Sequence, residues 1–253
     1  MAICSGRTVI ITGAGGGLGR AYALAFAAAG ANVVINDIRA DAAQDVAGEI
    51  RASGGQAIAN SDDITTLATA QHIIDAALGA FGEVHVLVNN AGVLRDRMFI
   101  SLSEEDWDMV MRVHLKGHYC LANLLGRRWR DLAKAGTPVD GRIINTSSGA
   151  GLQGSVGQSN YSAAKGAIAS LTLVQAAELA RYGITANALA PAARTSMTES
   201  AMPDVVKKPE DDSFDAWAPE NVAPLVVWLG STESAHVNGQ VFESQGGRIS
   251  LGD

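Results

Sequence analysis

Short apolar segments alternate with helix-like segments along almost the whole chain, and few folds accommodate that order. Segments that read as buried strands lie at residues 8–11, 32–36, 56–60, 84–88, 142–145, 185–189 and 239–243. Helices are predicted between them at residues 19–29, 40–53, 65–81, 104–135 and 161–181. Strands that are apolar throughout and alternate with helices form a parallel sheet covered on both faces. The sequence therefore predicts an α/β fold built on a doubly wound parallel sheet.

The length of 253 residues allows one large domain or two small ones, and no repeat or linker interrupts the pattern. The least regular stretch, residues 191–219, contains Met197, Met202, Pro203 and an acidic run at residues 210–212. Long irregular segments in compact domains are often lids. We therefore predict a mobile flap over a substrate site, with an ordinary surface excursion as the alternative.

Charge and cysteine content exclude several classes of partner. The formal net charge of −7 argues against nucleic-acid binding, which needs a basic face. The two cysteines, Cys4 and Cys120, are expected to be reduced thiols of a cytoplasmic protein. The apolar stretch at residues 21–35 is interrupted by Gly30 and Asn32 and is too short for a membrane span. No signal peptide is visible, so we expect no membrane partner.

A glycine-rich turn joins the first predicted strand to the first predicted helix. Residues 12–19 read Thr-Gly-Ala-Gly-Gly-Gly-Leu-Gly, which permits a tight turn and close approach of a pyrophosphate to the helix N-terminus. Asp37 ends the second strand, where a carboxylate accepts hydrogen bonds from an adenosine ribose and repels a 2′-phosphate. Arg39, the one nearby cation, is expected to be solvated. This pattern predicts NAD rather than NADP, with a plain strand-end turn residue as the alternative for Asp37.

Tyr161 and Lys165 are four residues apart and share one face of a helix. Ser148, thirteen residues before Tyr161, can reach the same pocket from a strand end, and this spacing favours it over Ser147. A lysine ammonium and a positive nicotinamide ring favour phenolate and lower the tyrosine pKa. Tyr161 is the predicted base in oxidation and acid in reduction, Lys165 lowers its pKa, and Ser148 bonds the substrate oxygen. An accidental pair on a helix surface is the alternative.

The glycine pattern, Asn89-Asn-Ala-Gly92, Ser148 and Tyr161-x-x-x-Lys165 resemble the short-chain dehydrogenase/reductase family in order and spacing, over nearly the whole chain. The resemblance implies a single Rossmann-type domain over residues 1–253, a seven-stranded parallel sheet, and a homodimer or homotetramer. It also implies cofactor contacts along the chain. These are Gly13, Gly17, Leu18 and Gly19 at the pyrophosphate, Asp37 at the ribose, Asp63 (or Asp62) and Ile64 at the adenine, Asn90, Ala91 and Gly92 along the sheet edge, Tyr161 and Lys165, which holds the nicotinamide ribose, and Thr195 near the carboxamide.

A closer resemblance is carried by residues 92–98, 105–108, 112–115, 157–165 and 219–226. These segments resemble the (3R)-hydroxyacyl-CoA dehydrogenase part of peroxisomal multifunctional enzyme type 2 and its bacterial relatives. The resemblance implies a 3-hydroxyacyl-CoA thioester as substrate. The basic residues that are candidates to meet the CoA phosphates are Arg95, Arg97, Arg194, Lys207 and Lys208.

The chain departs from the wider family at two places. His114 stands where many members have an asparagine that holds a water relay, and it is either a proton relay or a satisfied helix histidine. Pro191-Ala192 replaces a common Pro-Gly pair, which restricts the backbone near Thr195. No metal site is predicted, because the histidines form no ligand cluster. They are His72, His85, His114, His118 and His236.

Together these features predict an NAD-dependent oxidoreductase that interconverts a secondary alcohol and a ketone. The expected substrate is a 3-hydroxyacyl-CoA, and its acyl chain could be steroid-derived or bulky. One alternative is a hydroxysteroid or other free secondary-alcohol dehydrogenase. Another is a catalytically silent NAD-binding sensor or structural subunit, which the intact Ser148, Tyr161 and Lys165 set disfavours. The Ala/Leu-rich helices that begin near Glu104 and Tyr161 are expected to pair with a second subunit.

Overall fold

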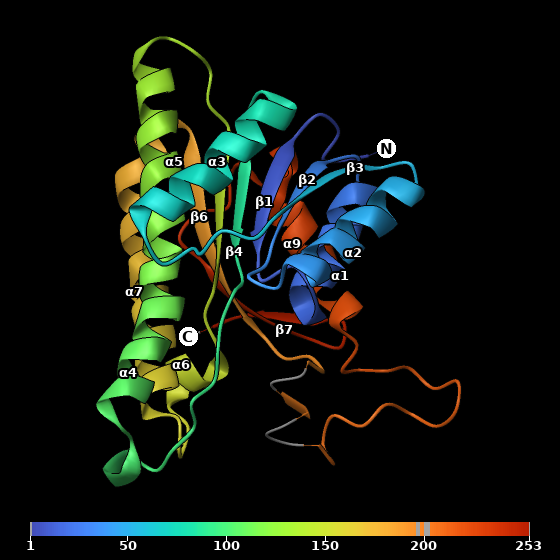
Figure 1. The fold of residues 1–253 in the computed structure, drawn as a ribbon, viewed down its shortest axis with the longest axis vertical. Helices are drawn as coiled ribbons and strands as arrows, with labels where there is room; N and C mark the ends of the chain where they lie inside the picture. Colours follow the sequence, from blue (N-terminus) through green and yellow to red (C-terminus); the bar gives the residue numbers. More distant parts are fainter. Residues whose placement is uncertain (1, 196–197, 200–202, 253) are drawn as a thin grey trace.

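The protein is described by a computed structural model that covers residues 2–195, 198–199 and 203–252 (Figure 1). Its strands are β1 Thr8–Thr12, β2 Asn32–Asn36, β3 Gln56–Asn60, β4 Val86–Asn89, β5 Gly141–Thr146, β6 Ile184–Pro191, β7 Val241–Gln245 and β8 Arg248–Leu251. Its helices include α1 Gly17–Ala28, α2 Ala40–Ala52, α3 Leu67–Phe81, α4 Glu104–Met111, α5 Gly117–Lys134, α6 Gly149–Gln153, α7 Ser159–Leu179 and α9 Ala223–Gly230. Among the described helices, none combines the length and apolar character that crossing a membrane requires.

All eight strands form one sheet in the order β3-β2-β1-β4-β5-β6-β7-β8. The first seven strands pair in parallel, as predicted, but β8 pairs with β7 in antiparallel register. The predicted count of seven strands is therefore wrong. The cause is the dipeptide Gly246-Gly247, whose φ angles are 52° and 79°. Two successive positive φ angles make a tight hairpin turn that returns the chain along the sheet edge.

Successive residues of each strand face opposite sides of the sheet, and each side is covered by its own helices. In β1, Val9 and Ile11 pack with residues of α1, α2 and α9, whereas Ile10 packs with residues of α3, α5 and α7. Figure 1 shows these two groups of helices on opposite faces of the sheet. Because both faces are buried, the strands are apolar throughout, which is what made them recognisable in the sequence.

The strand order reverses beside β1, which has β2 on one side and β4 on the other. In open parallel sheets, ligands bind beyond the carboxyl ends of the strands at such a reversal. Thr12 ends β1 and Asn89 ends β4, so the glycine-rich turn and the Asn-Ala-Gly segment meet at this point. The topology thus places the predicted nucleotide site at the carboxyl edge of the sheet.

The predicted long helix at residues 104–135 contains one turn of π-helix, Arg112–Lys116, between α4 and α5. A π turn inserts an extra residue into a helix and reorients the side chains around it. His114 lies in this turn and is buried. The helices α6 and α9 were not predicted, because five and eight residues are too few to show clear periodicity.

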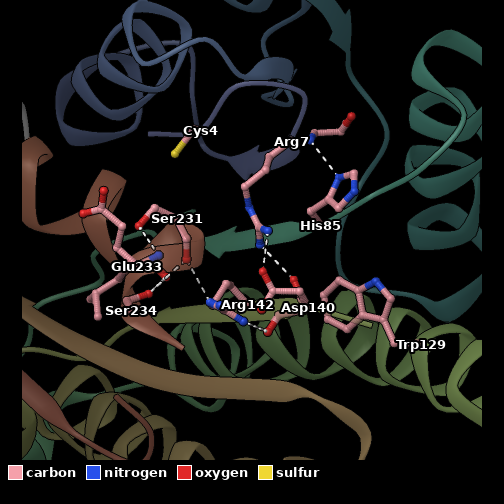
Figure 2. A network of polar contacts seen from close by, with 12 residues as sticks. Cys4, Arg7, His85, Trp129, Asp140, Arg142, Ser231, Glu233 and Ser234 are labelled. Carbon is pink, nitrogen blue, oxygen red and sulfur yellow. Dashed lines mark hydrogen bonds and ion pairs between the residues drawn. The ribbon is translucent and has the colours of Figure 1, made fainter. Parts of the chain in front are cut away.

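At the opposite, amino edge of the sheet, two arginines converge on one carboxylate (Figure 2). Arg7 donates to Asp140 Oδ2 at 2.7 Å and to its carbonyl oxygen at 2.8 Å. Arg142 Nη2 lies 2.5 Å from Asp140 Oδ1, and its Nε donates to the carbonyl of Ser231 at 3.1 Å. This network, here called the amino-edge network, joins the beginnings of β1 and β5 to the chain after α9.

Candidate active site

The glycine-rich turn leaves the first turn of α1 open to an anion. Gly13 and Gly17 have φ angles of 64° and 52°, which favour glycine. Gly16 is the N-cap of α1, and no side chain among the described residues caps it. The first backbone N–H groups of a helix are otherwise unpaired and carry partial positive charge. Leu18 packs against the core, and Gly19 has no room for a side chain because a Cβ would collide with Gly13 O.

The segment after β4 braces this turn from the side. Asn90 Nδ2 donates to the carbonyl oxygens of Thr12 and Gly13, at 3.0 and 3.2 Å. The Ala91 amide donates to Thr12 Oγ1 at 3.1 Å. A Cβ on Gly13 would lie 2.8 Å from Ala91 Cα, so the two segments are in close contact. The structure therefore shows Asn90 and Ala91 shaping the cradle itself.

Asp37 lies beside the glycine turn, as its place at the end of β2 predicted. Its Oδ2 accepts a hydrogen bond from the Gly15 amide at 2.9 Å, and its Oδ1 accepts from the Arg39 amide and Nε at 3.0 and 3.1 Å. Burial opposes ionisation, but the hydrogen bonds from Arg39 and Gly15 hold the Asp37 pKa below its usual value. Arg39 was expected to be solvated; it is largely exposed but ion-paired with Asp37, because the carboxylate lies two residues away.

The residues predicted at the adenine are already engaged within the chain. Asp63 Oδ1 accepts from the Thr65 amide at 2.8 Å, and its Oδ2 accepts from Thr65 Oγ1 at 2.9 Å. Ile64 is buried in the core that includes α3 and α5. The alternative, Asp62, accepts from Asn60 Nδ2 at 2.7 Å. Asp63 and Ile64 thus hold the turn after β3 in shape, which leaves their predicted adenine contact a prediction.

Thr195 comes close to the glycine turn although it is far from it in the sequence. A Cβ on Gly17 would lie 3.4 Å from Thr195 Cγ2, so the two residues are neighbours. The Thr195 amide donates to Thr198 Oγ1 at 2.7 Å. Of the predicted flap, residues 196–197 and 200–202, which include Met197 and Met202, lie outside the described residues.

Ser148, Tyr161 and Lys165 are brought together by the end of β5 and the first turns of α7. Ser148 is the N-cap of α6, and its Oγ accepts from the Ala150 amide at 3.2 Å. Its side chain also lies near enough to Tyr161 to lower the pKa of the phenol. Lys165 Nζ lies 5.6 Å from the centre of the Tyr161 ring and donates to the carbonyl of Thr146 at 2.6 Å. The three predicted catalytic side chains therefore form one cluster.

Close packing of α6 against α7 fixes this cluster. A Cβ on Gly151 would lie 2.6 Å from the carbonyl carbon of Lys165, so only glycine lets the two helices approach this closely. The neighbouring Ser147 is buried, and its Oγ donates to the carbonyl of Lys165 at 2.8 Å. Ser147 therefore holds α7 in place, and Ser148 is the serine that reaches Tyr161.

Burial changes the acid–base character of the cluster. It raises the pKa of Tyr161, which the Ser148 side chain opposes and the nearby Asp96 carboxylate reinforces. Burial also lowers the pKa of Lys165 to about 7. Desolvation of the phenol dominates in the chain by itself. The predicted lowering of the Tyr161 pKa, which included a bound nicotinamide ring, stays a prediction. A cationic group bound beside Tyr161 would favour its phenolate.

His114 packs edge-on against Tyr161, with 5.2 Å between the ring centres. Its Nε2 lies 2.7 Å from the carbonyl oxygen and 3.0 Å from the amide nitrogen of Val93. Gly92 makes room for the ring, because a Cβ there would collide with His114 Cε1. Burial, followed by the charge of Lys165, lowers the pKa of His114 to about 3, so this histidine is neutral at physiological pH.

Most of the basic residues proposed for CoA phosphates have carboxylate partners. Arg95 and Arg97 share Asp106, at 3.6 and 4.0 Å. Arg194 is ion-paired with Asp215 and also donates to the carbonyl of Val206. Lys207 lies 2.6 Å from Glu210. Arg95 and Arg97 thus differ from Arg194 and Lys207 in sharing a single carboxylate.

Buried asparagines support the site and were not predicted. Asn160 donates to the carbonyls of Arg95 and Asp106, at 3.1 and 3.3 Å, and its Oδ1 accepts from the Tyr161 amide at 2.8 Å. Asn89 Nδ2 donates to Asn145 Oδ1 at 3.0 Å, between the ends of β4 and β5. An asparagine at the end of an apolar strand was the available signal, since a buried amide needs specific partners.

The geometry can be compared with known proteins. Residues 7–205 match the short chain dehydrogenase family. The chain is 46% identical to a hydroxyacyl-CoA dehydrogenase of Mycobacterium tuberculosis, over 98% of this chain and 80% of that protein. It is 44% identical to mouse peroxisomal multifunctional enzyme type 2, over 96% of this chain and 32% of the mouse protein.

Among solved structures, a short chain dehydrogenase from Mycobacterium avium superposes with a TM-score of 0.90 at 55% identity, covering 99% of this chain and 86% of that one. The two structures therefore share the same fold. The chain therefore belongs to the short-chain dehydrogenase/reductase family, whose members are oxidoreductases that act on CH–OH groups with NAD(P).

Proposed function

We propose that this protein is an NAD-dependent dehydrogenase of 3-hydroxyacyl-CoA thioesters. The observation that carries the proposal is the position of Tyr161, which lies between Ser148 and Lys165 at the edge where the glycine turn opens. A phenol beside a buried lysine has no evident structural purpose, whereas alcohol oxidation needs a group that takes a proton. The relatives named above support the acyl-CoA assignment.

The residues at the carboxyl edge fit a nicotinamide dinucleotide. A side chain at position 13 or 19 would collide with the neighbouring backbone, so glycine is needed at both. The N-terminus of α1 suits a pyrophosphate. When bound, the nicotinamide accepts or donates the hydride. Ser148 Oγ would hydrogen-bond the substrate oxygen, and Tyr161 Oη would take the hydroxyl proton in oxidation and return it in reduction. Lys165 Nζ, held by the Thr146 carbonyl, would favour the phenolate and bond ribose hydroxyls.

The preference for NAD rests on Asp37. Its carboxylate stays ionised beside Gly15 and would accept bonds from ribose hydroxyls while repelling a 2′-phosphate. Arg39, which pairs with Asp37, is the group that could weaken this preference. Initial rates with NAD and NADP test the proposal; a higher kcat/KM with NADP would contradict it.

The preference for an acyl-CoA is supported by the corner at residues 95–100. Arg95 and Arg97 outnumber Asp106, the carboxylate they share. Met98 and Phe99 follow them directly and are exposed. A cationic corner beside exposed apolar side chains suits a ligand with both phosphates and an acyl chain. Equal turnover of a 3-hydroxyacyl-CoA and of its alcohol analogue without the CoA moiety would contradict this substrate and favour a free secondary-alcohol dehydrogenase.

We propose three further properties of the whole protein. Residues 1–253 form a single domain, because one sheet takes strands from both ends of the chain; limited proteolysis that releases two stable fragments would contradict this. The chain assembles as a homodimer or homotetramer through α5 and α7, whose Tyr119, Leu173 and Val174 are exposed; a monomeric mass by light scattering would contradict it. The free thiols Cys4 and Cys120 fit the reducing cytoplasm, which cell fractionation tests.

A further inference from the structure

The segment that carries Asp96 is fastened to the beginning of α7 on both sides. The carbonyl of Arg95 accepts from Asn160 Nδ2 at 3.1 Å, and the Arg97 amide donates to the carbonyl of Gly157 at 2.9 Å. Since Tyr161 follows Asn160 directly, the segment has a fixed position next to the first turn of α7, which carries Tyr161. Asp96 therefore occupies a defined place beside this turn.

The Asp96 carboxylate is only half satisfied by the protein. Its Oδ2 accepts from Gln158 Nε2 at 2.9 Å. Its Oδ1 is buried and has no hydrogen-bond partner among the described residues. A carboxylate near a helix N-terminus usually caps the helix through backbone N–H groups. Here the Tyr161 amide bonds to Asn160 instead, so a capping role does not account for the free oxygen.

The two neighbouring arginines form no ion pair with Asp96 within the described part of the chain. Both guanidinium groups lie near Asp106, at 3.6 and 4.0 Å. Their remaining contacts in the segment are to backbone carbonyls, Leu94 for Arg95 and Asp96 for Arg97, at 2.8 Å each. The ion pairs of both arginines are therefore with Asp106 and not with Asp96.

Four polar or charged groups face the Tyr161 phenol from the surrounding elements. Ser148 approaches it from the N-cap of α6, Lys165 lies over its ring from α7, and His114 packs edge-on from the π turn. The fourth is Asp96, and it raises the Tyr161 pKa. Burial lowers the pKa of His114 to about 3 and that of Lys165 to about 7, so His114 is neutral and Lys165 is easily deprotonated.

We propose that Asp96 is a specificity-determining residue that admits uncharged thioesters to Tyr161 and rejects the corresponding anionic acids. This inference rests on the function proposed above. Any substrate hydroxyl that bonds to Tyr161 brings the atoms next to it into the field of Asp96. In a 3-hydroxy acid, the carboxylate is two carbons from the reacting carbon, whereas a thioester places an uncharged carbonyl there. Repulsion between two like charges roughly 8 Å apart near a protein surface weakens binding by more than tenfold.

The test compares two substrates with one acyl chain, a 3-hydroxyacyl-N-acetylcysteamine thioester and the free 3-hydroxy acid. The truncated thioester lacks the CoA phosphates, so neither substrate carries a phosphate that Arg95 and Arg97 could bind. Asp96→Asn preserves shape and removes the charge. We expect the ratio of kcat/KM for thioester over acid to fall about tenfold or more, through a lower KM for the acid. Glu105→Gln, which removes an exposed carboxylate on α4, is the matched control and should leave the ratio unchanged.

A pH profile separates this role from a structural one. Oxidation needs ionised Tyr161, and removing the adjacent negative charge makes ionisation easier. The limb of kcat/KM that rises with pH should therefore move to lower pH in Asp96→Asn, but not in Glu105→Gln. A purely structural role would lower activity without moving the limb. If the wild type prefers the thioester but Asp96→Asn changes neither the kcat/KM ratio nor the position of the pH limb, the inference about Asp96 is overturned and the proposed function stands. A wild type with no preference for thioesters would overturn the proposed function as well.

Discussion

At the amino edge of the sheet the buried cation Arg142 is surrounded by acceptors, whereas at the carboxyl edge the buried cation Lys165 has one. Arg142 is 1% exposed and meets the carboxylate of Asp140 and two carbonyls (Figure 2). Lys165 is 2% exposed, and the only hydrogen bond of its Nζ within the described part of the chain is to the carbonyl of Thr146. The two buried positive charges therefore have different polar surroundings at the two edges of the sheet.

The difference shows in their acid–base behaviour. Burial lowers the pKa of both groups, but the Asp140 charge opposes this at Arg142, while nothing comparable opposes it at Lys165, whose pKa is about 7. A buried charge is costly unless it is paired. The amino edge therefore uses charge to join strands, and the carboxyl edge keeps groups whose protonation can change. Stability and chemistry are placed at opposite ends of the strands.

The largest expected effect is at the carboxyl edge. Tyr161→Phe removes the proton acceptor and should lower kcat by about 10²–10⁴-fold. The free energy of unfolding should change little, because the ring remains packed against His114. Steady-state rates and urea denaturation of the same preparation give both values. Turnover close to the wild-type level would show that the proton goes elsewhere.

The matching change at the amino edge should affect stability and spare chemistry. Asp140→Asn leaves Arg7 and Arg142 without their shared carboxylate and should cost about 2–4 kcal/mol of unfolding free energy. This is less than for a fully buried pair, since the Asp140 side chain is 38% exposed. In Asp131→Asn, which disrupts the exposed pair with Arg130, the loss should be below about 1 kcal/mol. If kcat/KM of Asp140→Asn fell together with its stability, the two edges of the sheet would not have separate roles.

The third prediction concerns pH. In the unfolded chain Lys165 stays protonated to near 10.5, its ordinary pKa, whereas in the folded chain it loses its proton near 7. Between these values the unfolded state binds the extra proton, so stability rises with pH. Wild type should gain on the order of 2 kcal/mol between about pH 7 and pH 9 relative to Lys165→Met.

Lys134→Met, which changes an exposed lysine at the end of α5, should keep the wild-type rise. Denaturant titrations across this pH range measure the difference. Parallel pH curves for wild type and Lys165→Met would mean that Lys165 keeps its charge in the folded protein. In that case the contrast with Arg142 would disappear.

The sequence was sufficient where a regular period fixes the spacing. Tyr161 and Lys165 share a helix face because the α-helical repeat puts residues four apart side by side. Asp37 could be placed because it ends an apolar strand next to the glycine turn. Both parts of the predicted site are close in the structure for these reasons.

The sequence was insufficient where contacts join distant residues. Arg7 and Asp140 are 133 positions apart, and no periodic pattern records their pairing. The contact of Asp96 with Gln158 spans 62 positions and likewise left no local trace. The π turn around His114 lies inside residues 104–135, which read in the sequence as one continuous helix. The eighth strand is different, because the Gly246-Gly247 pair was a hairpin signal that could have been recognised.

The last prediction separates the roles of two adjacent serines at the carboxyl edge, and its Ser147→Ala variant has the smallest effect expected. Ser147→Ala removes a buried hydrogen bond to the Lys165 carbonyl and should cost about 1 kcal/mol of stability, with kcat nearly unchanged. Ser148→Ala should instead lower kcat by about 10²-fold, because its hydroxyl is the one that reaches Tyr161. Thermal or urea unfolding and steady-state rates of both variants decide the matter. If Ser147→Ala lost the activity and Ser148→Ala kept it, the two roles would have been assigned to the wrong serines. Ser148 would then support α7, and Ser147 would contact the substrate.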